Sequence, residues 1–300
     1  RYSINNQKLW KSMVKQTSNP LSLSFVLYPI EEIKKKEELR RTSPHQIGKN
    51  NDSSSKNAIT LTLLFFKTIL VCRGAEMSAF KNLMEEVKFG YECAPYPWET
   101  ISELAVYVEK EGFDSFWMPD HTVGFGIRNW DSMEAWSFLS AVALKTRRIR
   151  LGTCVSDTYR HHPAVLAQMT TTCDIISNGR AILGIGIGEA MNLNPYGIVW
   201  DHPVSRTIDA LHVIKRLWTE DIVDYDGPYY KLRKAFLQPK PVQQPHVPIF
   251  IAGNSPRTMR MVAEFGDGWV PASMQPDEYK EGLKYVLDEA SKFGRFWDGM

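Results

Sequence analysis

The sequence is poor in cysteine. It has only four, and no two of them form a C-x-x-C pair, so the sequence signals neither a zinc or other metal site nor a disulfide framework. This usage favours a reducing, cytoplasmic location. The four residues are Cys72, Cys93, Cys154 and Cys173.

Long apolar runs and an excess of one charge are also missing. The apolar run at residues 58–72 is interrupted by Lys67 and is shorter than the roughly 20 residues that span a bilayer, so we expect no stable membrane insertion. The net charge is +2, and residues 87–300 carry 22 basic against 26 acidic side chains. This balance predicts no nucleic-acid partner.

The character of the chain changes near residue 86. Residues 1–86 contain a charged run at 31–38 and a low-complexity stretch at 49–57. We expect this N-terminal extension to be irregular, and either largely disordered or foreign to the domain that follows. Residues 87–300 alternate between short apolar runs and amphipathic stretches, which indicates a folded domain.

The alternation in residues 87–300 predicts strands followed by helices. The expected strands are 87–92, 115–118, 149–153, 181–186, 248–252 and 268–271, and the expected helices are about 98–111, 133–145, 163–176, 205–218, 256–265 and a last one from about 276. Strict strand–helix alternation is typical of a parallel α/β sheet.

A glycine-rich turn after the first strand is missing as well. Residues 93–97 read Cys-Ala-Pro-Tyr-Pro and cannot cradle a pyrophosphate, which disfavours a doubly wound dinucleotide-binding sheet. We therefore predict a (β/α)8 TIM barrel, whose chemistry lies at the C-terminal ends of its strands. Because about six strand–helix units fit before Met300, we expect this barrel to be truncated.

Candidate catalytic residues follow two of the expected strands. Asp120-His121 comes after strand 115–118, and a histidine there can exchange protons near neutral pH; alternatively, it caps the next segment. Glu189 follows strand 181–186, and partial burial at the barrel mouth suits a carboxyl group to proton transfer. Gly186 and Gly188 would let a flat ligand approach the backbone closely, unless they form an ordinary tight turn.

Other candidates are weaker on their residues alone. Nothing near Cys154 would lower the pKa of its thiol, so we interpret it as a small packing residue. Residues 252–258 end a strand and open a helix, where backbone N–H groups and Arg257 could bind a phosphate; the alternative is an ordinary N-cap by Ser255. We take His161 and His162 as loop residues rather than metal ligands.

Together these segments resemble the luciferase-like oxidoreductase superfamily over about residues 87–295. The matching stretches are Asp120-His121, residues 160–168, residues 177–180 leading into Gly188-Glu189-Ala190-Met191-Asn192, and residues 252–258. The Gly-Glu-Ala-Met-Asn stretch is most similar to the branch that uses the deazaflavin coenzyme F420. That branch includes methylenetetrahydromethanopterin reductase and dehydrogenases of secondary alcohols and glucose 6-phosphate.

The resemblance implies roles for individual residues. His121 and Glu189 match the pair that handles the substrate proton. Cys154-Val155 matches a non-prolyl cis peptide that backs the deazaflavin ring, and Asp120, Gly188 and Asn192 match positions around the coenzyme. Ala252, Gly253, Asn254 and Ser255 match the loop that holds its phosphate.

One residue departs from the dehydrogenase pattern. Phe125 stands where those enzymes have a tryptophan, and the loss of an indole N–H weakens the case for an alcohol or sugar substrate. Residues 196–200, ending in Val199-Trp200, resemble the pterin reductase instead. A pterin or another reducible molecule is therefore an alternative substrate, with Phe125 at the substrate position.

The resulting hypothesis is an F420-dependent oxidoreductase that acts on a small-molecule substrate as a cytoplasmic homodimer. Two alternatives stay open. One is an FMN-dependent monooxygenase on the same fold. The other is an inactive truncated barrel, because a barrel that lacks two strands has two open sheet edges.

Overall fold

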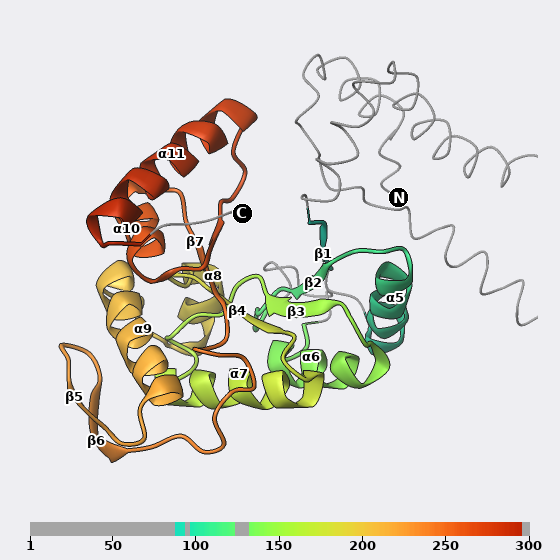
Figure 1. Ribbon diagram of the computed structural model, residues 1–300, viewed down its shortest axis with the longest axis horizontal. Helices are drawn as coiled ribbons and strands as arrows, with labels where there is room; N and C mark the ends of the chain where they lie inside the picture. Colours follow the sequence, from blue (N-terminus) through green and yellow to red (C-terminus); the bar gives the residue numbers. More distant parts are fainter. Residues whose placement is uncertain (1–87, 94–96, 124–131, 296–300) are drawn as a thin grey trace, which may run out of the picture. The chain divides into compact units, whose positions relative to one another are not determined.

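A computed structural model of the chain describes residues 88–93, 97–123 and 132–295 (Figure 1). The expectations for residues 1–86 and for Phe125 fall outside these described residues. Within them, strands and helices alternate along the chain as the apolar pattern predicts, and the strands form a curled parallel sheet with helices packed on its outer face.

Six parallel strands make up this sheet, and they follow each other in the order β1-β2-β3-β4-β7-β8. Each strand pairs with its neighbour in register, for example Trp117 with Gly152 and Phe250 with Gly268. The bounds are β1 Gly90–Glu92, β2 Ser115–Met118, β3 Arg150–Thr153, β4 Ala181–Ile185, β7 Ile249–Ala252 and β8 Gly268–Val270. The sheet is therefore a partial TIM-type barrel, truncated relative to the full one.

The helices begin and end where the sequence supplies caps. Pro163 occupies the first turn of α7, and Asn178 ends that helix in the left-handed region at φ 58°. Ser255 caps α10 by accepting from the N–H of Thr258 at 3.2 Å. The bounds are α5 Trp98–Lys110, α6 Ala135–Lys145, α7 Pro163–Ser177, α8 Ala190–Leu193, α9 Pro203–Thr219, α10 Pro256–Phe265 and α11 Pro276–Lys292, with a 3-10 turn, η1, at Asn194–Tyr196.

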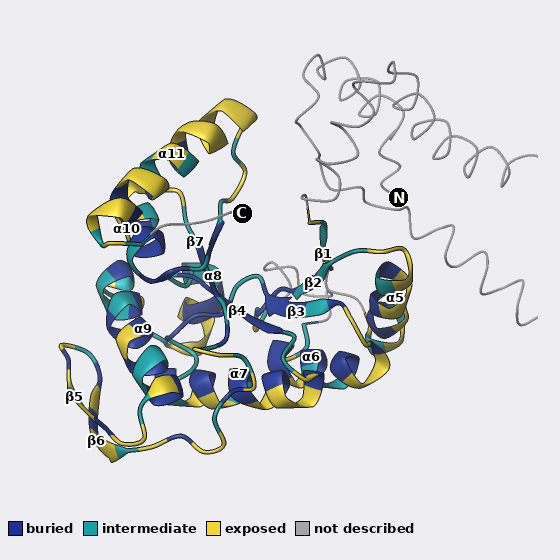
Figure 2. Cartoon of the chain, in the orientation of Figure 1, coloured by how far each residue is buried: buried dark blue, intermediate teal, exposed yellow. Residues whose placement is uncertain are grey.

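The core lies between the sheet and the inner faces of the helices, which are dark blue in Figure 2. Leu183 and Ile251 of the sheet and Leu139 and Leu211 of the helices are completely buried. Burying an aliphatic side chain of this size contributes about 1.5–3 kcal/mol each. This packing fixes the strands, so that the loops after them start from rigid positions.

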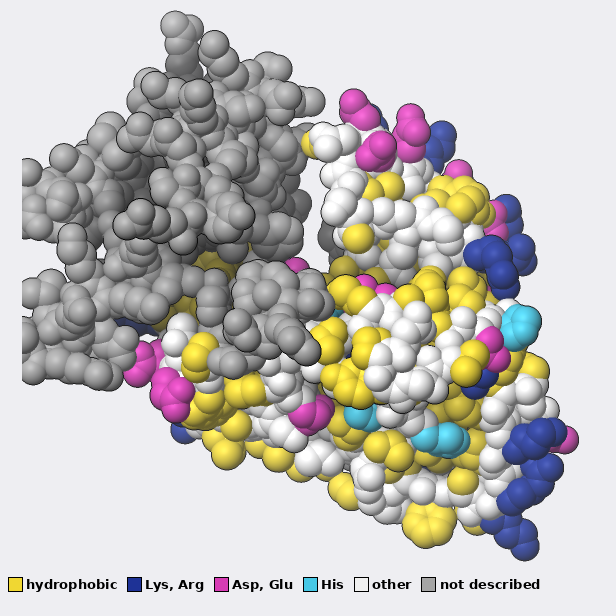
Figure 3. Space-filling view, turned by 180° about the vertical axis from the view of Figure 1, so that it is seen from behind, with side chains coloured by type: hydrophobic (Ala, Val, Ile, Leu, Met, Phe, Trp, Pro, Cys, Tyr) yellow, Lys and Arg dark blue, Asp and Glu magenta, His cyan; other side chains and the backbone are white. Residues whose placement is uncertain are grey.

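The sequence analysis missed one element, a hairpin formed by β5 (Val223–Asp226) and β6 (Lys231–Ala235). Only Val223 and Leu232 in these strands are buried, so the apolar signal is thin. Figure 3 shows basic side chains gathered over this hairpin, where Lys231 and Arg233 are 66% and 65% exposed. The hairpin lies between α9 and β7 in the chain and does not join the parallel sheet.

Candidate functional site

The structure brings His121 and Glu189 together. His121 follows β2 and Glu189 follows β4, and Nε2 of the imidazole lies 3.0 Å from Oε1 of the carboxyl group. The His121 side chain is 13% exposed and that of Glu189 is 44% exposed. A carboxylate only accepts, so Nε2 carries the hydrogen in this contact, and the pair can exchange a proton with a molecule at the carboxyl ends of the strands.

Asn192 links the same two loops. Its Oδ1 accepts from the backbone N–H groups of Thr122 and Val123 at 3.0 and 3.3 Å, and its Nδ2 donates to Oε1 of Glu189 at 2.8 Å. The side chain is 2% exposed, which limits its access to other partners. Asn192 therefore fixes Glu189 against the loop that carries His121. The contact with a coenzyme that the resemblance implies for Asn192 stays a prediction.

The environment of His121 favours the neutral imidazole. Burial lowers the pKa of His121, and although Glu189 raises it, Arg160 lowers it further and the net shift is downward. A neutral ring at physiological pH can share a proton with Glu189, whose carboxyl group is the more exposed of the two. This is the behaviour expected of a general acid–base group.

A buried ion cluster lies directly behind this pair, and its central residue was not singled out from the sequence. Arg160 donates to Oδ1 of Asp120 at 2.9 Å and to Oδ2 of Asp157 at 2.6 Å, and it also donates to the backbone carbonyl of Asp120. Asp120 accepts further from Ser156 Oγ at 2.5 Å. Because Asp120 precedes His121, the cluster holds the backbone from which the imidazole projects.

Asp120 itself is only 2% exposed, and both of its carboxylate oxygens accept hydrogen bonds within the protein. A direct contact between Asp120 and a coenzyme stays a prediction. No sequence signal identified the partnership with Arg160, because the two residues are 40 positions apart.

The peptide bond between Cys154 and Val155 is cis, as the resemblance implies. Val155 then occupies the space beside Gly186: a methyl group added at Gly186 would lie 2.7 Å from Cγ2 of Val155. The sequence analysis assigned the close approach at Gly186 to a ligand, whereas a side chain of the protein makes it. The role of the Cys154-Val155 bulge behind a coenzyme ring stays a prediction.

Gly188 adopts a φ of 72°, in the left-handed region that favours glycine. A methyl group there would lie 3.2 Å from the ring of Tyr159. The indole N–H of Trp200 donates to the carbonyl of Ile187 at 2.8 Å, which ties residues 196–200 to the same turn. The turn before Glu189 is thus held from two sides, while the predicted contact of Gly188 with a coenzyme is untested.

The loop of residues 252–255 lies at the N-terminus of α10. Asn254 bonds both backbone groups of Ala272, and the indole of Trp269 donates to the carbonyl of Gly253 at 2.8 Å. Asn254 and Ser255 are exposed, and Ala252 and Gly253 are half-buried. Ser255 is the N-cap, as the alternative interpretation held; a helix N-terminus in this position also suits a phosphate.

The other chemistry-bearing groups named in the sequence analysis make structural contacts. Burial raises the pKa of the Cys154 thiol well above its usual range, in line with its interpretation as a packing residue. His162 caps α7 by accepting from the N–H of Ala164 at 3.2 Å. Across the described ranges, no cluster of three or more His, Cys, Asp or Glu side chains could hold a metal ion.

No helix within residues 88–93, 97–123 and 132–295 is long and apolar enough to cross a membrane.

Comparison with known proteins gives consistent matches. A family model described as luciferase-like monooxygenase matches residues 83–298. A phthiodiolone/phenolphthiodiolone dimycocerosates ketoreductase of Mycobacterium sp. (strain JLS) is 36% identical over 203 residues, which cover 61% of this chain and 53% of the ketoreductase. An F420-dependent glucose-6-phosphate dehydrogenase of Kineococcus radiotolerans is 35% identical over 212 residues, which cover 68% of this chain and 62% of the dehydrogenase.

Among solved structures, an F420-dependent secondary alcohol dehydrogenase in complex with an F420–acetone adduct superimposes with a TM-score of 0.66 at 29% identity. The match covers 70% of this chain and 66% of that enzyme. The chain spans about half the length of the ketoreductases it matches.

Proposed function

The chain belongs to the luciferase-like monooxygenase family, and from this we propose that it is the site-bearing part of an oxidoreductase. In this proposal, a hydride passes between the deazaflavin coenzyme F420 and a small organic substrate. The observation that carries it is the 3.0 Å contact between His121 and Glu189, two groups supplied by separate strand ends. The F420-dependent dehydrogenase and alcohol dehydrogenase among the matched proteins support the choice of coenzyme.

The residues present fit such a coenzyme in two respects. The partly exposed pair of His121 and Glu189 provides a proton donor and acceptor at the carboxyl ends of the strands, where a redox ring needs one. The N-terminus of α10, opened by exposed Asn254 and Ser255, presents backbone N–H groups suited to a phosphate. The coenzyme supplies the hydride chemistry when bound, and the protein positions it and manages the proton.

Each side chain has a defined task in this proposal. Glu189, the more exposed of the two, exchanges the proton with the substrate, and His121 shares that proton through Nε2 across their contact. Asn192 holds the carboxyl group of Glu189, and the Arg160–Asp120 pair holds the backbone next to His121, so that the two groups stay in contact. Proper placement of such groups contributes roughly 10²–10⁴-fold to the rate of proton-coupled reactions.

The substrate class follows from the resemblance and not from the described residues. A ketone–alcohol pair and a reducible pterin are both compatible with this proton pair, and Phe125, which would decide between them, lies outside the described residues. The homodimer and the cytoplasmic location also stay predictions.

The proposal is tested by titrating the chain with F420 and with FMN while following tryptophan fluorescence. We expect F420 to bind more tightly. Tighter binding of FMN would support the monooxygenase alternative. A cooperative thermal transition of the same chain would count against an inactive, misfolded barrel.

The proton role is tested by Glu189→Gln. This substitution keeps the bond to Asn192 but removes the proton-accepting carboxylate, so turnover should fall by about 100-fold while F420 affinity changes little. Glu220→Gln is the matched control, because Glu220 pairs with Arg216 at the end of α9. Unchanged turnover in Glu189→Gln would refute the assigned role.

A further inference from the structure

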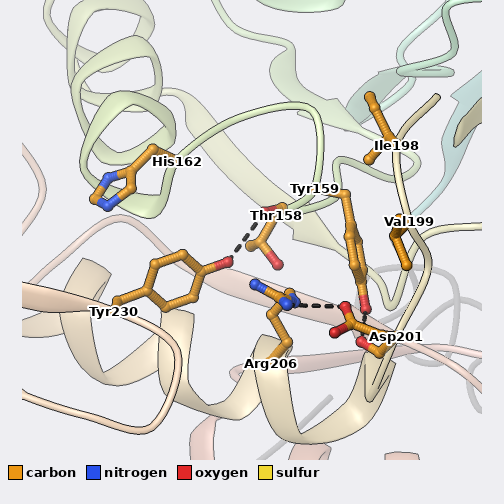
Figure 4. A pocket seen from close by; sticks show the side chains of 8 residues that line it. All are labelled: Thr158, Tyr159, His162, Ile198, Val199, Asp201, Arg206 and Tyr230. Carbon is orange, nitrogen blue, oxygen red and sulfur yellow. Dashed lines mark hydrogen bonds and ion pairs between the residues drawn. The ribbon is translucent and has the colours of Figure 1, made fainter. Parts of the chain in front are cut away.

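A pocket that contains neither His121 nor Glu189 lies next to the turn before Glu189, because Tyr159 lines the pocket and its ring approaches Gly188. Its volume is about 380 Å³, within the range of small-ligand sites. Figure 4 shows side chains from the loop after β3, the segment before α9, the first turn of α9 and the β6 end of the hairpin converging on it. The lining residues are Thr158, Tyr159, His162, Ile198, Val199, Asp201, Arg206 and Tyr230.

Two buried polar atoms in this pocket have no hydrogen-bond partner within the described part of the chain. They are the hydroxyl of Thr158, whose residue is 4% exposed, and Nε of Arg206. In Figure 4 the Thr158 hydroxyl points toward the Arg206 guanidinium. A buried donor without a partner typically costs 1–3 kcal/mol, so the two atoms together indicate that an acceptor binds between them.

The side chains around these atoms are fixed before any ligand binds. Arg206 donates through Nη2 to Asp201 at 2.8 Å and lies over the rings of Tyr159 and Tyr229, at 5.2 and 4.8 Å from their centroids. Tyr230 donates to the carbonyl of Thr158 at 3.0 Å. These contacts preorganise the donors, which lowers the entropic cost of binding.

The charges nearby favour a neutral acceptor over an anion. Among the lining side chains, Asp201 already balances Arg206, with Nη2 2.8 Å from Oδ1. An anion would add an unbalanced negative charge beside the Asp201 carboxylate in a partly buried site. A carbonyl oxygen accepts from two donors without adding charge, and an adjacent N–H could donate to the carboxylate of Asp201.

We propose that this pocket is a binding site for a small neutral molecule that bears a primary carboxamide. The carbonyl oxygen accepts from Thr158 Oγ1 and Arg206 Nε, the amide N–H donates to Asp201, and a short hydrocarbon tail packs on Ile198 and Val199. None of the atoms that would hold the carboxamide belongs to His121 or Glu189. Tyr159 nevertheless connects the pocket to the turn before Glu189, because its ring packs against Gly188.

The experiment titrates the full chain with propionamide, followed by ¹H NMR of the propionamide methyl group, with sodium propionate and 1-propanol as comparison ligands. We expect propionamide to bind at least fivefold more tightly than either. Propionate binding as tightly as propionamide would overturn the proposal, because it would identify an anion site. A crystal soaked in propionamide that shows only a water between the two donors would also overturn it.

Variants of the chain identify the pocket as the place of binding. Thr158→Val and Arg206→Lys should each weaken propionamide binding by about fivefold, while Thr158→Ser, which keeps the hydroxyl, should bind like the parent. Arg216→Lys is the matched control on the same helix, since Arg216 pairs with Glu220 instead. Equal affinity of Thr158→Val and Thr158→Ser would overturn the proposal.

Repeating the titration with F420 present distinguishes two kinds of ligand. Unchanged affinity for propionamide assigns the pocket to a separate molecule. Reduced affinity assigns it to a carboxamide-like group of the coenzyme or of a substrate that reaches across from the site. Both results support a carboxamide subsite, and the mutational test does not depend on whether F420 binds.

Discussion

The two ends of the parallel sheet both hold a half-buried arginine, but the two arginines have different partners. At the carboxyl end Arg160 contacts the carboxylates of Asp120 and Asp157. At the amino end Arg180 donates to the backbone carbonyls of Ser177, Ile149 and Ala143 at 2.7, 2.8 and 2.9 Å. One arginine is therefore bound by charges and the other by neutral acceptors.

The difference shows in the electrostatics of the two guanidinium groups. Burial lowers the pKa of both, but at Arg160 the two aspartates outweigh it and the net shift is upward, whereas at Arg180 the net shift is downward. At the amino end, Arg180 joins the ends of α6 and α7 and the start of β3 through their backbone carbonyls. The carboxyl end uses its arginine to place a loop that carries a reactive group, and this agrees with the division of labour in barrels.

The largest expected effect comes from Arg160→Met. It leaves two buried carboxylates without a cation, so the free energy of unfolding should fall by about 4 kcal/mol at pH 7. Urea denaturation measures it. The affinity for F420 should fall as well, because Asp120 directly precedes His121 and the imidazole would shift with it. A loss below about 1 kcal/mol would contradict the assignment of Arg160 as the centre of the cluster.

Arg180→Met should have a smaller effect, about 2 kcal/mol, since it removes hydrogen bonds to neutral carbonyls. Here the affinity for F420 should not change. Arg233→Met, at an arginine that is 65% exposed on the hairpin, provides the control. A loss in Arg180→Met as large as that in Arg160→Met would remove the contrast between the two ends.

The smallest effect is the contribution of His121 to the pH dependence of stability. Burial holds the pKa of His121 below its ordinary value of 6.5, so the unfolded chain binds the proton more readily than the folded one. The stability that the neutral ring contributes is present above pH 6.5 and is lost as the pH falls through the pKa of the folded state. Unfolding of the His121→Gln variant across this range measures it.

The same histidine offers a sharper measurement by NMR of its ring protons. Because Glu189 raises the pKa of His121, Glu189→Gln should lower that pKa further. Burial also lowers the pKa of His162, which caps α7 and should not respond to this substitution. An unchanged pKa of His121 in the Glu189→Gln variant would show that the two side chains do not interact in solution.

Local patterns in the sequence were sufficient for most of the sheet. The predicted helix 256–265 matches α10 at both ends, and the predicted strands differ from the observed ones by at most a few residues. Apolar periodicity works for these elements because each buries one face against the sheet. The hairpin was missed because only Val223 and Leu232 are buried in it, although Asp226-Gly227 is a turn signal that could have indicated it.

The candidate site was less accessible from the sequence. The placement of His121 and Glu189 after two strands of one parallel sheet put both at the same edge, and the family resemblance supplied the pairing, although β3 lies between β2 and β4. Arg160 also contacts Asp120, 40 positions away, and Asn192 also contacts Thr122, 70 positions away, so these contacts depend on how three strand ends meet. At Gly186 the sequence showed that a small residue is present but not why. The side chain that leaves no room for a methyl group there, Val155, is 31 positions away in the chain.

The contacts of Asn192 make one atom decisive for the geometry around Glu189. Its amide nitrogen donates to that carboxylate, so replacing the nitrogen by a charged oxygen, as spontaneous deamidation does, would turn an attraction into a repulsion. The imidazole would then lose its neighbour without any change in the core. Deamidation of Asn192 would therefore lower the activity of the protein without unfolding it.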